Sequence, residues 1–223
     1  MKVLVATEKP FAKIAVDGIK KEIEGAGFEL ALLEKYTDKV QLLDAVKDAN
    51  AIIIRSDIID AEVLDAAKEL KIVVRAGAGY DNVDLNAAAI NNITVVRVPA
   101  YSPYAVAEYT VALMLSLNRK IPRATWRTKD GNFSLHGLMG FDMHGKTAGI
   151  IGTGKIAKIL IHILKGFGMN ILAYDLYPDH NFAREEQIVY TSLDELYHSS
   201  DIISLHCPLT EQTKYLINDY SIQ

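Results

Sequence analysis

The chain has 223 residues, half of them hydrophobic and 23% charged, which is typical of a globular protein that forms one large domain or two small ones. Its formal net charge of −4 gives no reason to expect a nucleic-acid or membrane partner. One cysteine cannot form an intrachain disulfide, and the N-terminus enters an apolar strand without the pattern of a signal peptide, so we expect a cytoplasmic protein.

Residues 1–98 alternate short apolar runs with segments whose hydrophobic residues recur at helical spacing. Strands that are apolar on both faces and joined by such helices indicate a parallel sheet covered on both sides. Ligands of these sheets bind beyond the carboxyl ends of the strands. The predicted strands are 3–6, 28–32, 51–54, 72–74 and 95–98. Three helices are predicted between them: the first has Pro10 in its first turn, the second carries Val40, Leu43 and Val46, and the third is capped by Asp60.

Two of these predicted strands run into arginines. Strand 51–54 is followed by Arg55, and strand 72–74 by Arg75 and a glycine-rich loop. An arginine at a strand end is usually a solvated surface charge. The loop after Arg75 favours an anion-binding role instead, because successive backbone N–H groups of a glycine-rich loop can form a concavity that binds anions.

A second domain is expected from residue 99 onward. Ser102 and Pro103 predict the cap and the first residue of a helix. Residues 106–117 are almost entirely apolar, so this helix is either buried or part of a subunit interface. Residues 126–145 are polar and contain several glycines, which predicts a loop. Later predicted elements are a strand at 188–190, a helix at 193–197 and a buried strand at 202–205.

Residues 146–175 have the pattern of a dinucleotide-binding βαβ unit. An apolar run leads into Gly152-Thr153-Gly154, an amphipathic helix begins near Lys155, and a second apolar run ends at Asp175. Gly152 permits the tight turn, and Gly154 lets a pyrophosphate approach the backbone at the positive end of the helix.

Asp175 stands 21 positions after Gly154, where a carboxylate can accept hydrogen bonds from an adenosine ribose. Two alternatives exist. The glycine turn is one of an unrelated α/β protein, or Asp175 is only a helix cap or a surface acid. Because both strands, the helix and the acid are all present, the sequence favours dinucleotide binding.

Four separated motifs together resemble the D-2-hydroxyacid dehydrogenase family. They are RAGAGYDNVDL at 75–85, PAYSPYAVAEYTVALML at 99–115, GIIGTGKIAKIL at 149–160 with Asp175, and DIISLHCPLTEQTKYLIN at 201–218. The resemblance implies an NAD-dependent oxidoreductase that acts on the CH–OH group of a small D-2-hydroxy acid. It also implies two doubly wound α/β domains with parallel sheets: a flavodoxin-like substrate-binding domain over 1–98, and an incomplete Rossmann NAD-binding domain over 99–223.

The resemblance further implies which residues of this chain meet substrate and cofactor in the cleft between the two domains, with no metal involved. The N–H groups of Ala78 and Gly79 would face the substrate carboxylate, and Tyr101 would close over the substrate. Lys155 and Ile156 would meet the pyrophosphate. The full set is Arg55, Arg75, Ala78, Gly79 and Tyr101 for the substrate, and Gly152, Gly154, Lys155, Ile156, Asp175, Cys207, Pro208 and Thr213 for NAD.

The two halves of the chain resemble different family members. Residues 1–92 are similar to phosphoglycerate dehydrogenases, in which arginines matching Arg55 and Arg75 handle the anionic substrate. Residues 93–223 are similar to fermentative D-lactate dehydrogenases. Because the lactate-like segment is longer, D-lactate or pyruvate is slightly favoured as substrate and 3-phosphoglycerate comes next. The helix after Ser102 resembles the element through which these enzymes form homodimers.

The family's catalytic arginine, glutamate and histidine follow the motif at 201–218, so this chain resembles an N-terminal fragment with no catalytic residue of its own. Its six histidines, including His206 near the expected cofactor pocket, do not match the proton donor. We therefore expect the chain by itself to be inactive, with an unpaired apolar edge beyond strand 202–205. The alternative function is a non-catalytic NAD-binding sensor, similar to the corepressors that share this fold.

Overall fold

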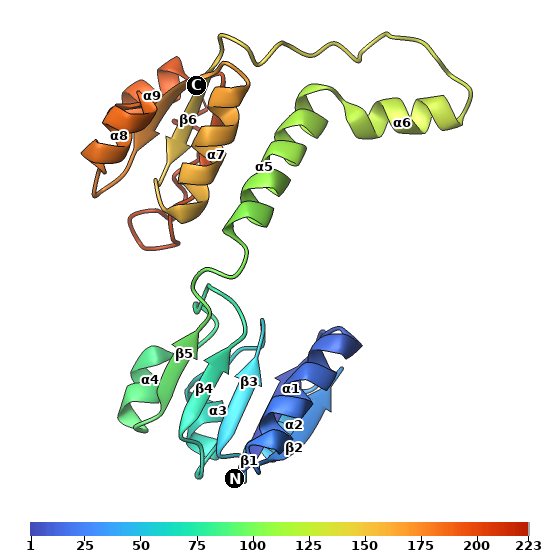
Figure 1. Cartoon of the computed structure of the whole chain (residues 1–223), viewed down its shortest axis with the longest axis vertical. Coiled ribbons are helices and arrows are strands. Elements are labelled where there is room, and N and C mark those ends of the chain that lie inside the picture. Colours follow the sequence, from blue (N-terminus) through green and yellow to red (C-terminus); the bar gives the residue numbers. More distant parts are fainter. Residues whose placement is uncertain (223) are drawn as a thin grey trace. The chain divides into compact units, whose positions relative to one another are not determined.

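The computed structural model describes residues 1–222, which form two compact units, each with its own parallel sheet. The first unit is Met1–Tyr101 and the second begins at Ser102. This boundary lies a few residues after the division at 98 that the sequence suggests. Figure 1 labels the helices and strands of both units.

The first unit contains a five-stranded sheet with the order β2-β1-β3-β4-β5, in which all neighbouring strands are parallel. This is the flavodoxin-like strand order that the family resemblance implies. The elements are β1 (Lys2–Thr7), α1 (Lys13–Gly25), β2 (Glu29–Glu34), α2 (Lys39–Ala45), β3 (Ala51–Ile54), α3 (Ala61–Ala66), β4 (Ile72–Arg75), α4 (Leu85–Ile90) and β5 (Thr94–Arg97).

The core of this unit lies on one face of the sheet, under α2, α3 and α4. Leu42, Leu64 and Ala88 of these helices are buried in one cluster with Ile52 and Val73 of the strands. Helix α1 contributes no buried side chain, and its Ile14 is 83% exposed. The prediction of a sheet covered on both sides is therefore fulfilled on one face and only in part on the other.

Two helix starts of the first unit were predicted from single residues, and the structure confirms one of them. Asp60 caps α3 as predicted, since its Oδ1 accepts a hydrogen bond of 3.2 Å from the Val63 N–H. The prediction for Pro10 is wrong, because α1 begins at Lys13 with Ala12 as its N-cap. Proline fixes its own φ but does not by itself start a helix.

The second unit contains a four-stranded parallel sheet with the order β8-β7-β6-β9. Strand 202–205 pairs with the first strand of the dinucleotide unit, and among the described residues its far edge is unpaired, as predicted. The elements are α5 (Pro103–Asn118), α6 (Ile121–Lys129), β6 (Thr147–Ile151), α7 (Lys155–Gly166), β7 (Asn170–Tyr174), α8 (His180–Glu186), β8 (Val189–Tyr190), α9 (Leu193–Ser199) and β9 (Ile202–Leu205).

Strand β6 is the centre of this unit and is buried on both faces. Ala148 and Ile150 point into a cluster with side chains of α5 and α7, and Figure 1 shows α7 alongside β6. Successive strand residues alternate between faces, so Gly149 faces the opposite side. There a Cβ on Gly149 would lie 2.6 Å from Cδ2 of Leu196, so this glycine lets α9 pack closely.

The segment around α5 and α6 differs from its prediction in two ways. Ser102 and Pro103 occupy the N-cap and first position of α5 as predicted, but the Ser102 side chain makes no capping hydrogen bond. Helix α6 was not expected, and it takes the first residues of the predicted loop 126–145. A left-handed residue, Lys120 at φ 53°, separates the two helices.

Helix α5 is buried along one side only. Ala107 and Val111 lie in the core, whereas Tyr109, Leu113 and Leu117 are 64%, 53% and 75% exposed. The alternative of a fully buried helix is therefore wrong for this chain. No helix within residues 1–222 is both long enough and apolar enough to span a membrane.

Candidate functional site

A cavity of about 300 Å³ opens where three parallel strands of the second unit end. Ile151 of β6 lies opposite Tyr174 of β7 and Leu205 of β9, so the residues that follow these strands meet at one edge. The lining residues are Ile151, Gly152, Gly154, Tyr174, Asp175, Leu176, Tyr177, Leu193, His206, Cys207, Pro208, Thr210, Gln212, Thr213 and Leu216.

Gly152 forms the tight turn predicted after β6. Its φ of +88° suits glycine, and its N–H donates a 2.7 Å hydrogen bond to the Tyr174 carbonyl. A Cβ at this position would lie 2.7 Å from the Cys207 backbone nitrogen. Both the backbone angle and the neighbouring chain therefore require glycine here.

Gly154 differs from Gly152, because nothing in the folded chain requires it to be glycine. It is the N-cap of α7 with φ −70° and ψ −172°, which other residues adopt freely. No atom lies within 4 Å of a Cβ built on it. The free space at the start of α7 is thus a place where an anionic group can approach the helix N-terminus. Lys155 and Ile156 form the first turn of α7 and do not line the cavity.

Asp175 is held at the cavity by three hydrogen bonds. Oδ2 accepts from the Thr153 backbone N–H at 2.6 Å and from the Thr153 hydroxyl at 2.8 Å, and Oδ1 accepts from the Tyr177 N–H at 2.9 Å. Burial by itself would raise the pKa of Asp175, but these hydrogen bonds outweigh it and hold the pKa below its usual range. Asp175 is therefore an ionised carboxylate at neutral pH.

The loop after β9 supplies the opposite wall of the cavity. Cys207, Pro208 and Thr213, which the family resemblance assigns to the cofactor pocket, line this cavity, and the Thr213 hydroxyl donates a 2.6 Å hydrogen bond to the Pro208 carbonyl. His206 also lines the cavity, with Nε2 2.9 Å from the Ser204 hydroxyl. Burial lowers the pKa of His206, so its imidazole is neutral at neutral pH.

In the first unit, Arg55 and Arg75 come to adjacent strand ends. Arg75 lies opposite Ile54 in the β3–β4 register, so Arg55 is the next residue on the neighbouring strand. The Arg55 guanidinium stands 5.4 Å from the centre of the Phe11 ring. The Arg75 side chain folds over Gly77, and its buried Nε has no hydrogen-bond partner among residues 1–222.

Two polar side chains that the sequence did not reveal, Asn82 and the buried Asp57, hold these two strand ends together. Nδ2 of Asn82, from the glycine-rich loop, donates to the carbonyls of Arg55 and Asp57 at 3.3 and 2.7 Å. The Asp57 carboxylate is only 5% exposed and accepts 2.8 Å hydrogen bonds from the Glu8 N–H and the Tyr36 hydroxyl. The loops after β1, β3 and β4 are therefore tied to one another.

The remaining predicted substrate residues lie along the same chain segment. The Ala78 carbonyl accepts a 2.7 Å hydrogen bond from Arg97, whose guanidinium stands 5.0 Å from the Tyr80 ring centre. Gly79 is exposed in this loop, and Tyr101 is 67% exposed at the end of the first unit. Arg97 was not predicted, although its place at the end of β5, opposite Arg75, was a usable signal.

Thr153 and Tyr190 are the main residues of the second-unit site that the sequence did not reveal. Thr153 is 5% exposed and bonds Asp175, and the Tyr190 hydroxyl lies 2.8 Å from Thr153 Oγ1. The position of a threonine between two glycines was the available signal for Thr153. Within residues 1–222, no three histidine, cysteine, aspartate or glutamate side chains are placed to hold a metal ion.

Comparison with known proteins assigns the second unit to one family. The model of the D-isomer specific 2-hydroxyacid dehydrogenase NAD-binding domain matches residues 111–223. The D-lactate dehydrogenase of Escherichia coli is 43% identical over all of this chain and 67% of its own length. The D-3-phosphoglycerate dehydrogenase of Archaeoglobus fulgidus is 39% identical over 97% of this chain and 40% of its own length.

The fold matches solved structures of the same kind. The D-lactate dehydrogenase of Aquifex aeolicus, solved with NAD and lactic acid, aligns with a TM-score of 0.86 at 32% identity. That alignment covers 98% of this chain and 64% of the other. The chain spans about two thirds or less of the length of the curated relatives it matches.

Proposed function

Because this chain belongs to the D-isomer specific 2-hydroxyacid dehydrogenase family and carries its NAD-binding domain, we propose that the protein is an NAD-dependent oxidoreductase. It acts on the CH–OH group of a small D-2-hydroxy acid. The observation that carries this proposal is the open space at Gly154 on the same cavity as the ionised Asp175.

The cavity residues are suited to the parts of NAD in turn. Gly154 and the N-terminus of α7 would receive the pyrophosphate, with Lys155 and Ile156 in the first turn of that helix. Asp175 would accept a hydrogen bond from the adenosine ribose. Cys207, Pro208 and Thr213 would line the adenosine and nicotinamide pocket, beyond the turn at Gly152. Bound NAD supplies the hydride acceptor.

The substrate proposal rests on the first unit. Arg55 and Arg75 supply positive charge at adjacent strand ends, and the loop of Ala78 and Gly79 supplies backbone N–H groups for a carboxylate. Tyr101 would close over the substrate. We propose D-lactate and pyruvate as the favoured pair, with 3-phosphoglycerate next, because the lactate-like segment of the chain is the longer one.

We also propose that residues 1–223 by themselves do not turn over a 2-hydroxy acid. His206 is the one histidine that lines the described cavity, and its ring is already engaged by Ser204. No family motif gives it a role in proton transfer. The chain would therefore bind NAD without supplying the proton that a 2-oxo acid needs during reduction.

We propose that the protein is cytoplasmic and forms a homodimer, and the exposed side of α5 supports the homodimer. Tyr109, Leu113 and Leu117 are each more than half exposed on a helix whose other side is in the core. Large exposed apolar side chains on one helix face are typical of a protein interface. The two copies would meet along α5.

The enzyme proposal is tested with protein expressed from its complete reading frame. NADH oxidation is followed with pyruvate and with 3-phosphohydroxypyruvate, and NADH binding is measured in parallel by fluorescence. Turnover of either acid with NADH supports the proposal, and failure to bind NADH contradicts it. The alternative, a non-catalytic NAD-binding sensor, predicts NADH binding without turnover of any 2-oxo acid.

A further inference from the structure

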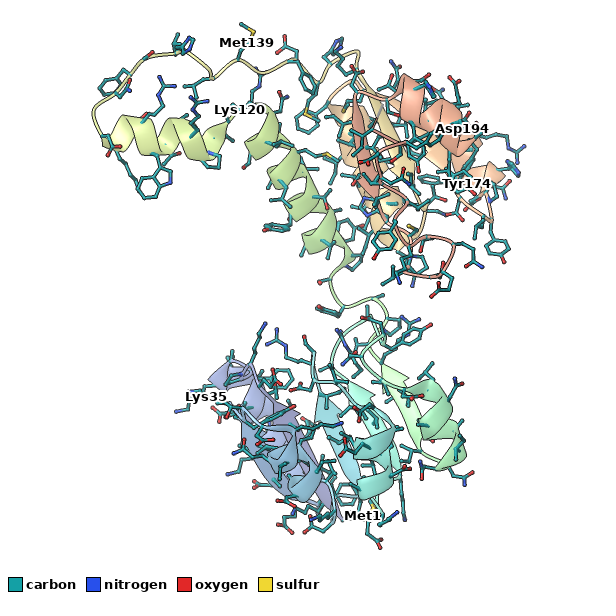
Figure 2. The ribbon with its side chains drawn as sticks, turned by 180° about the vertical axis from the view of Figure 1, so that it is seen from behind. Met1, Lys35, Lys120, Met139, Tyr174 and Asp194 are labelled. Carbon is teal, nitrogen blue, oxygen red and sulfur yellow. The ribbon has the colours of Figure 1, made fainter. Side chains whose placement is uncertain are left out.

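We propose that Tyr190 is a positioning residue for cofactor selection, which acts through Thr153 to hold the Asp175 carboxylate in the orientation that accepts a ribose hydroxyl. This inference deepens the proposed function and rests on it. All three side chains lie in the second unit, and they come from β8, the glycine turn and the end of β7. Figure 2 labels Tyr174, the last residue of β7, which immediately precedes Asp175.

The hydrogen bonds of this group can run in one direction only. An ionised carboxylate only accepts, so the Thr153 hydroxyl must give its proton to Asp175 Oδ2, 2.8 Å away. Thr153 Oγ1 then accepts from the Tyr190 hydroxyl at 2.8 Å. The Tyr190 oxygen in turn accepts from the Asp179 backbone N–H at 3.2 Å. Each hydroxyl therefore donates once and accepts once.

Packing and further bonds fix the far end of this chain of hydrogen bonds. Asp179 caps α8 through the Phe182 N–H at 3.1 Å and pairs with Lys158 of α7 at 2.5 Å. The Tyr190 ring meets the His180 ring edge-on, with centroids 6.1 Å apart. The Tyr190 hydroxyl is thus anchored to two helices, and it transfers that order to Thr153 and Asp175.

The number of hydrogen bonds that the Asp175 carboxylate already accepts indicates which cofactor it favours. Asp175 Oδ2 accepts two hydrogen bonds and is filled, whereas Oδ1 accepts one, from Tyr177, and keeps a free position. A ribose with a free 2′-hydroxyl can donate to that position. A 2′-phosphate has no such proton to give and meets the negative charge of the carboxylate. Without the Tyr190 hydroxyl, Thr153 can turn away and Asp175 loses one of its fixed donors.

The test compares dissociation constants for NADH and NADPH in matched variants of the full-length protein. Tyr190→Phe removes one hydroxyl and keeps the ring. Thr153→Val removes the Thr153 hydroxyl, whereas Thr153→Ser keeps it. Tyr220→Phe is the control, since the 67% exposed Tyr220 also meets a carboxylate, at 3.5 Å from Asp194, but stands outside the group.

We expect Tyr190→Phe and Thr153→Val to weaken NADH binding by about threefold to tenfold, the loss expected for one hydrogen bond. NADPH binding should change less, so the preference for NADH falls. Thr153→Ser and Tyr220→Phe should keep the wild-type preference. A purely structural role would lower the melting temperature and weaken both cofactors together.

Two failures are distinguishable. If the wild type prefers NADH but Tyr190→Phe keeps the same NADH-to-NADPH ratio, the role of Tyr190 is overturned while the proposed function stands. The role is also overturned if Thr153→Ser loses the preference as fully as Thr153→Val does. If the wild type binds neither cofactor, or both equally, the proposed NAD function itself is overturned.

Discussion

Thr153 donates two hydrogen bonds to a single oxygen of Asp175, one from its backbone N–H at 2.6 Å and one from its hydroxyl at 2.8 Å. Because Thr153 stands between the two glycines of the turn, the proposed pyrophosphate site and the proposed ribose site belong to one hydrogen-bonded unit. The distance between the two sites is therefore fixed before any ligand arrives, which reduces the entropy cost of binding.

The first prediction concerns the charge of Asp175. We expect Asp175→Ala to weaken NADH binding by about tenfold and to strengthen NADPH binding, because the ribose partner and the repulsion of a 2′-phosphate are lost together. Fluorescence titration of both cofactors checks this. Asp142→Ala is the matched control, since Asp142 is an exposed acid of the same unit that pairs with Arg119 at 2.7 Å. An Asp175→Ala variant with no gain in NADPH affinity would sink the assignment.

The second prediction separates the two glycines of the turn. Gly154→Ala should change the free energy of unfolding by less than about 1 kcal/mol, because the backbone angles are ordinary and the surroundings open, and the smaller entropy of the unfolded chain offsets the weaker N-capping by alanine. It should nevertheless weaken NADH binding strongly, since the new methyl group fills the proposed pyrophosphate space. Gly152→Ala should instead destabilise the fold by about 1–3 kcal/mol, because of its positive φ and the close Cys207 backbone.

Urea unfolding and NADH titration of both variants provide the check. The idea that Gly154 is kept for the ligand is wrong if Gly154→Ala binds NADH like the wild type. The structural account of Gly152 is wrong if Gly152→Ala unfolds at the wild-type urea concentration. The pair thus tests fold and function at two positions that are separated by a single residue.

The third prediction concerns the substrate. If Arg75 takes part in binding a second anionic group, Arg75→Ala should lower kcat/KM for 3-phosphohydroxypyruvate by about 100-fold and affect pyruvate less. Arg75 lies at a strand end beside Arg55, so an anionic group bound there would meet two positive charges. Arg184→Ala, on the exposed surface of α8, is the control. Steady-state kinetics with both acids decide, and full activity of Arg75→Ala on the phosphorylated acid would remove the idea.

The fourth prediction is a dependence of stability on pH in the first unit. Burial raises the pKa of Tyr36, and the hydrogen bond to Asp57 and its negative charge raise it further. The folded chain therefore keeps the Tyr36 proton at a pH where the unfolded chain loses it. The free energy of unfolding should fall as pH rises above about 10, by at most about 1.4 kcal/mol per pH unit for this one group.

Tyr36→Phe isolates this contribution. At about pH 8 the variant should be less stable than the wild type by about 1–3 kcal/mol, because Asp57 loses a partner. The difference should shrink as pH rises above about 10. Urea unfolding across this range measures it, with Tyr215→Phe, 78% exposed, as control. A difference between wild type and Tyr36→Phe that stays constant with pH would contradict the prediction.

Sequence patterns predicted most of the fold because the local preferences of the residues favour the same elements that the sheets require. The strand runs, the cap at Asp60 and the glycine turn at Gly152 follow from burial, hydrogen bonding and backbone angle, each of which limits residue choice at one place. Helix α6 escaped prediction because it is short and polar, and it begins after a left-handed Lys120 that no residue type announces. The exposure of α1 escaped because an apolar repeat shows a face but not what covers it.

The residues of the candidate site also fall into a predictable and an unpredictable group. Gly152, Gly154 and Asp175 were predictable, because their spacing within one βαβ unit carries the information. Tyr190 was not, because its contact with Thr153 spans 37 residues and depends on the pairing of β8 with β7. For the same reason Tyr36 and Asp57 remained hidden, since they are joined only by the folding of separate loops.

The hydrogen bond between Tyr190 and Thr153 also sets the size of the segment that can be exchanged between relatives. A graft that replaces only residues 175–179 brings a new acid or loop into contact with the old Thr153 and Tyr190 hydroxyls, which keep their present donor directions. In such chimeras the hydroxyls of Thr153 and Tyr190 would not match the hydrogen-bond acceptors of the grafted segment. Cofactor redesign in this protein should therefore vary positions 153, 175 and 190 in one library.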